Sequence, residues 1–177
     1  MIEGKRIILR KLEEEDLLRM LEWINDSEIA YLVGIDQPIS RDEQKKWYQG
    51  LLEDQTKRVF AIEFKEDKKH IGNISLDTID WRNRNARLTI FIGEKSLRNQ
   101  GIGHDVLSTF LNYCFNHLNL NRIYLLVHED NQPAIRLYEK CGFKKEGLLR
   151  NHEYYYGKYI NKIVMGLFKS EFEEIIQ

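Results

Sequence analysis

The chain has few of the residues that mark extracellular, repetitive or multi-domain proteins. Among its 177 residues there are two prolines and two cysteines, and no segment is rich in glycine and serine or of low complexity. This composition predicts neither a linker nor a repeat, so we expect residues 1–177 to form a single domain. A domain of this length is stable without disulfides. We therefore predict that Cys114 and Cys141 are free thiols, as is typical of a reducing compartment.

An excess of charge of either sign is also absent. Lys and Arg together number 27, Asp and Glu together number 28, and the formal net charge is −1. Without a basic surface we expect no nucleic-acid partner. No apolar run approaches the ~18 residues that a membrane span requires, and charges begin at Glu3 and Lys5. We therefore expect no membrane association and a cytoplasmic location.

What the chain does have is a regular alternation of apolar and polar residues. In the first half this pattern predicts a strand, two helices and three more strands. These segments are 6–10, 17–24, 40–51, 60–64, 71–76 and 88–92. In the second half it predicts a helix, a strand covered on both faces, a second helix and two final strands. These segments are 103–114, 123–127, 131–142, 143–149 and 160–168. The fold class is therefore α/β, of the α+β type, with helices packed on a mixed sheet.

The segment Arg98-Asn99-Gln100-Gly101-Ile102-Gly103 connects a predicted strand to a predicted helix. Two glycines one residue apart allow a tight turn whose N–H groups converge at a helix N-terminus, where the helix dipole favours an anion. Such a loop is typical of pyrophosphate binding. A dinucleotide fold is disfavoured because Val106 stands where a third glycine is needed, and the Gly-Lys-Ser/Thr of a P-loop is absent. An isolated Gly-x-Gly is also typical of a plain strand-to-helix turn.

A second motif follows downstream, Asn131-Gln132-Pro133-Ala134-Ile135-Arg136-Leu137-Tyr138 and then Lys140-Cys141-Gly142-Phe143. Together the two motifs resemble those of the GNAT superfamily of N-acetyltransferases. In that family an Arg/Gln-x-x-Gly-x-Gly/Ala loop holds the pyrophosphate of coenzyme A, and an Asn-x-x-Ala-x-x-x-Tyr helix followed by Gly-Phe lies on the other side. The resemblance runs from the first strand to about Phe168.

The resemblance implies the GNAT fold, a mostly antiparallel mixed sheet in which the strands ending near Ile92 and Val127 run parallel and splay apart to leave a cleft. It also implies acetyl-CoA as co-substrate, no metal, and direct acetyl transfer to a primary amine. The cofactor-binding residues that it implies are Phe91, Ile92, Arg98, Asn99, Gln100, Gly101, Ile102, Gly103, His104 and Asn131. Phe91 and Ile92 would bind pantetheine through their backbone. Tyr138 would be the general acid that protonates the departing thiolate.

A general base does not carry over from the family. Some members place a Glu on the strand ahead of the phosphate loop, where this chain has Arg87, and others place one on the strand before the Asn motif, where it has Leu126. The remaining candidates are His128, Glu129, His152 and Glu153. A chain of water molecules to bulk solvent would serve equally well if the amine arrives deprotonated.

The acceptor is left open by the sequence. The Tyr-rich segment 151–159 resembles the hairpin before the last strand in the RimJ/RimL-like branch and in spermidine acetyltransferases, where tyrosine rings would hold a cationic amine. The same rings would equally cover an exposed hairpin. Asp26, Glu28 and Asp36 would attract a polyamine or a basic peptide, or form a solvated surface. Protein N-termini, polyamines, amino sugars, aminoglycosides and small metabolites all remain candidates.

Two further points stay open at this stage. A non-catalytic acyl-CoA-binding module of the same fold is the alternative function, and the presence of Tyr138 favours catalysis over it. The oligomeric state, including a homodimer, is not determined by these residues.

Overall fold

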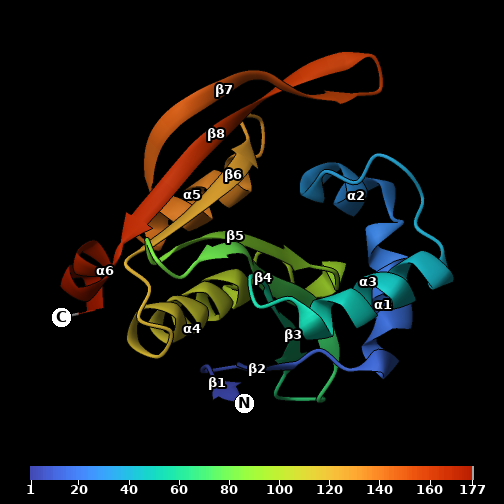
Figure 1. Ribbon diagram of the computed structural model, residues 1–177, viewed down its shortest axis with the longest axis horizontal. Helices are drawn as coiled ribbons and strands as arrows, with labels where there is room; N and C mark the ends of the chain where they lie inside the picture. Colours follow the sequence, from blue (N-terminus) through green and yellow to red (C-terminus); the bar gives the residue numbers. More distant parts are fainter. Residues whose placement is uncertain (177) are drawn as a thin grey trace.

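The computed structural model describes residues 1–176, and its central feature is an eight-stranded mixed sheet (Figure 1). The strand order is β1-β2-β3-β4-β5-β6-β8-β7, and only β5 and β6 pair in parallel within this part of the chain. The strands are β1 (Ile2–Glu3), β2 (Ile7–Lys11), β3 (Arg58–Phe64), β4 (His70–Asp80), β5 (Asn85–Ile92), β6 (Arg122–His128), β7 (Lys144–Tyr155) and β8 (Lys158–Phe168). The predicted mixed, mostly antiparallel sheet is confirmed.

Helices cover both faces of this sheet. The helical segments are η1 (Glu14–Asp16), α1 (Leu17–Ile24), α2 (Ser27–Val33), α3 (Arg41–Glu53), η2 (Lys95–Leu97), α4 (Ile102–Asn116), α5 (Gln132–Lys140) and α6 (Lys169–Ile176). Alternate side chains of a strand point to opposite faces. In β3, Ile62 and Phe64 join the main core with α4, whereas Ala61 joins a smaller core with Leu17 of α1 and Tyr48 of α3.

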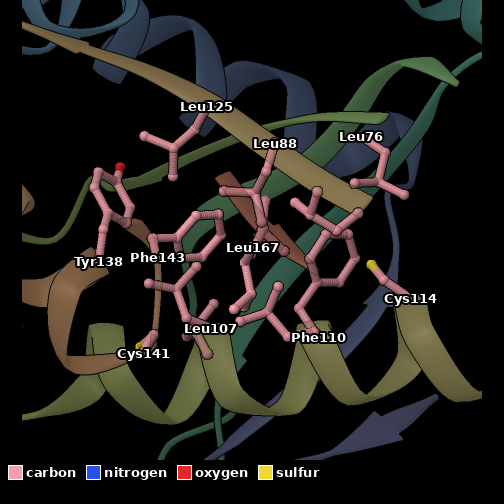
Figure 2. Packing of buried hydrophobic residues seen from close by; sticks show 14 of the residues in the cluster. Leu76, Leu88, Leu107, Phe110, Cys114, Leu125, Tyr138, Cys141, Phe143 and Leu167 are labelled. Atoms are coloured by element: carbon pink, nitrogen blue, oxygen red, sulfur yellow. The ribbon is translucent and has the colours of Figure 1, made fainter. Parts of the chain in front are cut away.

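The main core rests on the apolar face of α4, as the helical spacing predicted. Leu107, Phe110 and Cys114 are fully buried, and Figure 2 shows Leu107 and Phe110 pointing from the helix toward Leu88 of β5. Burying one such side chain stabilises a fold by about 1.5–3 kcal/mol relative to leaving it exposed. This packing fixes α4 below the sheet, so its N-terminus lies close to the end of β5 (Figure 1).

β5 and β6 diverge after a short paired stretch. They pair in parallel from Asn85↔Arg122 to Arg87↔Tyr124. Beyond that point β5 follows its antiparallel neighbour β4 up to Ile92↔Gly72, and β6 follows β8 up to His128↔Lys162. The predicted splayed parallel pair is confirmed, because each strand follows its outer neighbour.

Several elements were missed or misplaced by the sequence analysis. β1 is too short to show a period, and α2 is a seven-residue helix between the cap Asp26 and the left-handed Gly34. α6 continues directly from β8 at Lys169. β7 extends to Tyr155, whereas the sequence predicted an end at 149. Its full length was missed because most of its residues are exposed and show little apolar alternation.

The two cysteines are free and buried, as predicted. Burial raises the pKa of both thiols, and it raises that of Cys141 to about 11. Neither thiol is therefore a thiolate near neutral pH, and both serve as small apolar side chains. Separately, none of the helices within residues 1–176 combines the length and apolar character that a membrane span requires.

Candidate active site

A cavity of about 450 Å³ opens where β5 and β6 diverge. Its walls come from the second half of β5, the loop before α4 and the first turn of α4, the end of β6, α5, and α2. The lining residues used below are Glu28, Phe91, Ile92, Arg98, Asn99, Gly101, Gly103, His104, His128, Asn131 and Tyr138. The cavity therefore joins the two sequence motifs that lie far apart in the chain.

Most of the predicted cofactor-binding residues line this cavity, and two do not. Gln100 turns its side chain back, so that its Nε2 donates to the carbonyl oxygen of Ser96 at 2.7 Å. Ile102 is 1% exposed and belongs to the main core. The side chains of these two residues thus anchor the loop, and only their backbone groups remain for a ligand.

The N-terminus of α4 is capped by no side chain. Its N-cap residue Gly101 has φ +80°, and Asn99 before it has φ +61°. Two residues of the loop therefore have a left-handed backbone conformation just before the helix begins. The first-turn N–H groups of a helix lack intrahelical partners, and together with the dipole they attract anions. A Cβ on Gly103 would lie 2.9 Å from Cδ2 of Leu137. Glycine at 103 therefore leaves room for the Leu137 side chain of α5 beside the first turn of α4.

Arg98 ties this loop to β5 and to α2. Its Nε donates to the carbonyl oxygen of Ile92 at 3.0 Å, and its Nη1 donates to Glu28 at 2.6 Å. Lys95 lies 3.1 Å from the other oxygen of Glu28. The hydrogen bond from Lys95 and the charge of Arg98 lower the pKa of Glu28, so the carboxylate stays ionised. The guanidinium is thereby held at the edge of the cavity.

α5 supplies Asn131 and Tyr138. Oδ1 of Asn131 accepts from the backbone N–H of Ala134 at 3.2 Å, which confirms the predicted N-cap and leaves the amide nitrogen to donate. The ring of Tyr138 meets that of Phe143 edge to face, with 5.9 Å between centroids. Figure 2 shows the Tyr138 hydroxyl pointing away from Cys141 and Leu107. Burial raises the pKa of Tyr138, so its hydroxyl keeps its proton.

Of the four residues left as candidate bases, the structure brings two together. Nε2 of His128 lies 2.6 Å from Oε2 of Glu153, although 25 residues separate them. Glu129 instead accepts a hydrogen bond from Asn161, and His152 is exposed on β7. The register of β7 shifts between Leu149 and Glu153, and Glu153 contacts His128 at the end of β6.

Three residues missed by the sequence analysis complete this cluster. Lys162, opposite His128 in the β6–β8 ladder, is buried and donates to Glu153. The ring of Tyr31 lies 4.5 Å from that of His128, and its hydroxyl donates to Asp130 at 3.0 Å. Tyr31 lies on helix α2, which the sequence did not predict. Lys162 could have been found from the sequence, because a lysine within the apolar alternation of β8 indicates a buried charge that needs a partner.

The charges of this cluster compensate one another. Partial burial raises the pKa of the Glu153 carboxyl, but hydrogen bonds from Lys162 and His128 outweigh it, so the pKa lies below its ordinary value. Burial and the hydrogen bond to Asp130 raise the pKa of Tyr31 to about 12. At neutral pH Glu153 is therefore ionised and Tyr31 is neutral.

The Tyr-rich hairpin divides into two sets of rings. Tyr155 lies 5.0 Å from Tyr31, centroid to centroid, and so reaches the cluster. Tyr154, Tyr156 and Tyr159 are 62%, 86% and 65% exposed. The acidic residues divide in the same way: Asp26 and Glu28 are paired with Lys95 and Arg98, and Asp36 is exposed.

Comparison with known proteins identifies the family. Residues 6–144 match the family model described as the Acetyltransferase (GNAT) domain. The chain belongs to this family. It is an N-acetyltransferase whose acetyl donor is acetyl-CoA and whose acceptor is an amine.

Curated relatives cover almost the whole chain. A spermidine N(1)-acetyltransferase of Vibrio cholerae is 31% identical over 96% of this chain and 96% of its own length. The enzyme of the same name from Escherichia coli K12 is 30% identical over 93% of this chain and 87% of its own length. An uncharacterised N-acetyltransferase p20 of Bacillus licheniformis is 32% identical over 95% and 96%.

A solved structure has the same fold over its full length. The crystal structure of spermidine N-acetyltransferase from V. cholerae in complex with CoA and spermine superposes with a TM-score of 0.89 at 30% identity. The match covers 96% of this chain and 99% of that chain. The GNAT fold that the sequence motifs implied is therefore confirmed.

Proposed function

We propose that the protein acetylates a primary amine of a polyamine, with acetyl-CoA bound in the cavity between β5 and β6. The observation that carries the proposal is this cavity, which joins the uncapped N-terminus of α4 to the Tyr138 side chain. The acceptor class rests on the names of the spermidine acetyltransferases of V. cholerae and E. coli.

The pyrophosphate of coenzyme A would bind at the start of α4. The backbone N–H groups of 102–104 point out of the first helical turn, and an anion there is stabilised by the helix dipole. Arg98 lies at the same edge, with Glu28 and the Ile92 carbonyl fixing its guanidinium. A bound pyrophosphate would therefore meet a positive group that is already oriented.

The pantetheine arm would extend along β5. After Arg87 the strand pairs with β4 on one side and has lost β6 on the other. The N–H and C=O groups of 88–92 that face the gap can therefore bond an extended amide chain, as a strand partner would. The free amide nitrogen of Asn131 offers a further donor from the opposite wall.

Transfer would be direct, with Tyr138 as the acid. The amine attacks the thioester carbonyl, the C–S bond breaks, and the departing thiolate takes the hydroxyl proton of Tyr138. Cys141 fits a nucleophilic role poorly because burial keeps its thiol protonated, with a pKa of about 11.

The cationic acceptor would enter from the side of α2 and β7. There Asp130 and Glu153 contribute carboxylates, and Tyr31 and Tyr155 contribute aromatic rings. Ammonium groups are attracted both by carboxylates and by the faces of such rings. A polyamine, which carries several ammonium groups, suits this combination better than a neutral amine does.

The free, buried thiols also fit a reducing compartment, and on that basis we place the enzyme in the cytoplasm. This placement agrees with a polyamine acceptor and with acetyl-CoA as donor. An intermolecular or intramolecular disulfide in protein purified without reductant would contradict it.

The test is release of free coenzyme A thiol from acetyl-CoA with a panel of amines. The panel contains spermidine, spermine, a peptide with a free N-terminus, glucosamine and an aminoglycoside, each compared by kcat/KM. We expect the polyamines to have the highest values. The acceptor assignment would be contradicted if another amine is acetylated and neither spermidine nor spermine is.

A further inference from the structure

The end of β6 carries a buried histidine whose second nitrogen has no partner. His128 is 3% exposed and lines the same cavity as Tyr138. Its Nε2 lies 2.6 Å from Oε2 of Glu153, and its Nδ1 is buried without a hydrogen bond. A buried polar atom without a partner is uncommon in folded proteins and calls for a physical reason.

Glu153 determines which nitrogen of His128 carries the proton. The carboxylate accepts from Lys162 as well as from His128, so it stays ionised and can act only as an acceptor. In the neutral form of the imidazole, Nε2 must therefore carry the proton. The lone pair is left on Nδ1, the atom that lacks a partner.

We propose that His128 is the general base of the transfer and that its Nδ1 takes the proton from the acceptor ammonium, directly or through one water molecule. The assignment rests on the direct transfer proposed above and holds whichever amine is the acceptor. Glu153 is then a positioning residue: it fixes the imidazole tautomer and stabilises the imidazolium that forms. Lys162 in turn holds Glu153.

The protons balance over one turnover. The ammonium gives one proton to Nδ1 of His128, and the neutral amine attacks the thioester carbon to form the C–N bond. When the C–S bond breaks, the thiolate takes a proton from Tyr138, and the acylated nitrogen returns one of its own to Tyr138. His128 finally releases its proton to solvent, so that one proton leaves for each acetyl group transferred.

Charged and titratable groups surround His128 on three sides. β7 contributes Glu153, β8 contributes Lys162, and α2 contributes the Tyr31 ring 4.5 Å away, which is itself bonded to Asp130. The negative Glu153 favours the imidazolium, and the positive Lys162 opposes it. The charges that face His128 are therefore of both signs, and a general base among them must accept a proton and release it again in each turnover.

A glutamine variant separates the base from its structural contacts. In His128→Gln, the side-chain amide can still donate to Glu153 but has no basic nitrogen. We expect kcat/KM at pH 7 to fall by roughly 10²–10⁴-fold while the coenzyme A affinity is unchanged. The matched control is His117→Gln, which removes an exposed imidazole just beyond the far end of α4 and should retain full activity.

The pH profile of kcat/KM distinguishes a general base from a structural residue, because the loss of a structural contact would not shift it. With wild-type enzyme, kcat/KM should rise with pH and reach its plateau well below the pH at which a free amine loses its proton, because the base takes that proton. With His128→Gln, the rise should move to about pH 10, where a free primary amine loses its own proton. Wild-type turnover together with a wild-type pH profile in this variant would overturn the assignment.

A second measurement needs neither the variant nor an acceptor. Imidazole ¹⁵N spectra of the wild-type protein, with His128 assigned through its contact with Tyr31, should report a protonated Nε2 and a bare Nδ1 at pH 8. The opposite tautomer would refute the proposal even if the variant fails to fold. Acetylation of another amine with no turnover of polyamines would refute the acceptor proposal alone. The comparison of wild type and His128→Gln would then be made with that amine, and its pH profiles would decide the role of His128.

Discussion

Replacing Tyr138 by phenylalanine removes the proposed acid and leaves the surrounding core in place. The side chain is 9% exposed, and its ring contacts Phe143 edge to face at 5.9 Å. Phenylalanine keeps that ring and loses only the oxygen. We therefore expect the free energy of unfolding to change by no more than one hydrogen bond contributes, about 0.5–1.5 kcal/mol.

The effect on catalysis should be much larger. A positioned proton donor typically accelerates a reaction by ~10²–10⁴-fold. At about 1.36 kcal/mol for each factor of ten, that corresponds to ~2.7–5.4 kcal/mol of the barrier. Because Tyr138 acts on the leaving thiolate only as the C–S bond breaks, kcat and kcat/KM should fall together while the dissociation constant of coenzyme A stays the same.

The assay is thiol release under saturating and limiting acetyl-CoA, with calorimetry for coenzyme A binding. Tyr113→Phe is the matched control, since Tyr113 contacts Phe60 and Phe110 in the core and does not line the cavity. Burial raises the pKa of Tyr138 above its ordinary value of 10.0, so the hydroxyl stays protonated and wild-type activity should persist up to at least pH 10. Undiminished turnover in Tyr138→Phe, or an acetylated enzyme trapped without acceptor, would refute the reasoning.

Three further changes test the cofactor site and the fold. Gly103→Val should weaken coenzyme A binding, because the added side chain would crowd Leu137, and both positions line the cavity. Gly147→Val, with open space around it, should bind normally in calorimetry. Coenzyme A should slow hydrogen exchange at alternate amides of 88–92, which lack a partner on one side, and unchanged exchange would argue against backbone binding of pantetheine. Asp16→Asn should lower the free energy of unfolding in urea by about 1.5–3 kcal/mol, since Arg10 donates to this carboxylate at 2.7 and 2.8 Å and keeps a second carboxylate partner. Burial raises the pKa of Asp16, but hydrogen bonds from Arg10 and the Glu13 backbone, together with nearby charges, bring it below its ordinary value of 3.8. This stabilisation is therefore complete above pH 3.8 and disappears as the pH falls through the lower pKa of the folded state. An equal difference between variant and wild type at pH 7 and pH 2 would contradict it.

The part of the cavity that we propose to bind the cofactor could be predicted because it is local. Residues 98–104 are contiguous, and their glycines and helix start determine the geometry by themselves. The helix from Asn131 to Tyr138 is equally local, with a cap, a proline in its first turn and a tyrosine on its buried face. Local sequence therefore predicted most of the cavity wall, apart from the side chains of Gln100 and Ile102, which point elsewhere.

The cluster that we propose to accept the proton could not be predicted because it depends on strand register. Four candidates for the base stood in the sequence, and only pairing across β6, β8 and β7 decides that His128 and Glu153 meet. That register includes a bulge in β7, a largely exposed strand with little apolar pattern. The contribution of Tyr31 depends in addition on α2, whose seven residues are too few for a helical period to show.

The divergence of β5 and β6 links the two halves of the proposed mechanism. The proposed cofactor site lies on β5 and on the loop that follows it, whereas His128 lies on β6. Each strand is held by a ladder on its outer side, to β4 and to β8, so closing the gap would break main-chain hydrogen bonds on one side. The separation of thioester and base is then a property of the sheet itself. The acceptor amine must fit between the thioester and His128, within hydrogen-bond reach of the base, so the distance between β5 and β6 must stay fixed. Regular strands maintain such a distance better than flexible loops do.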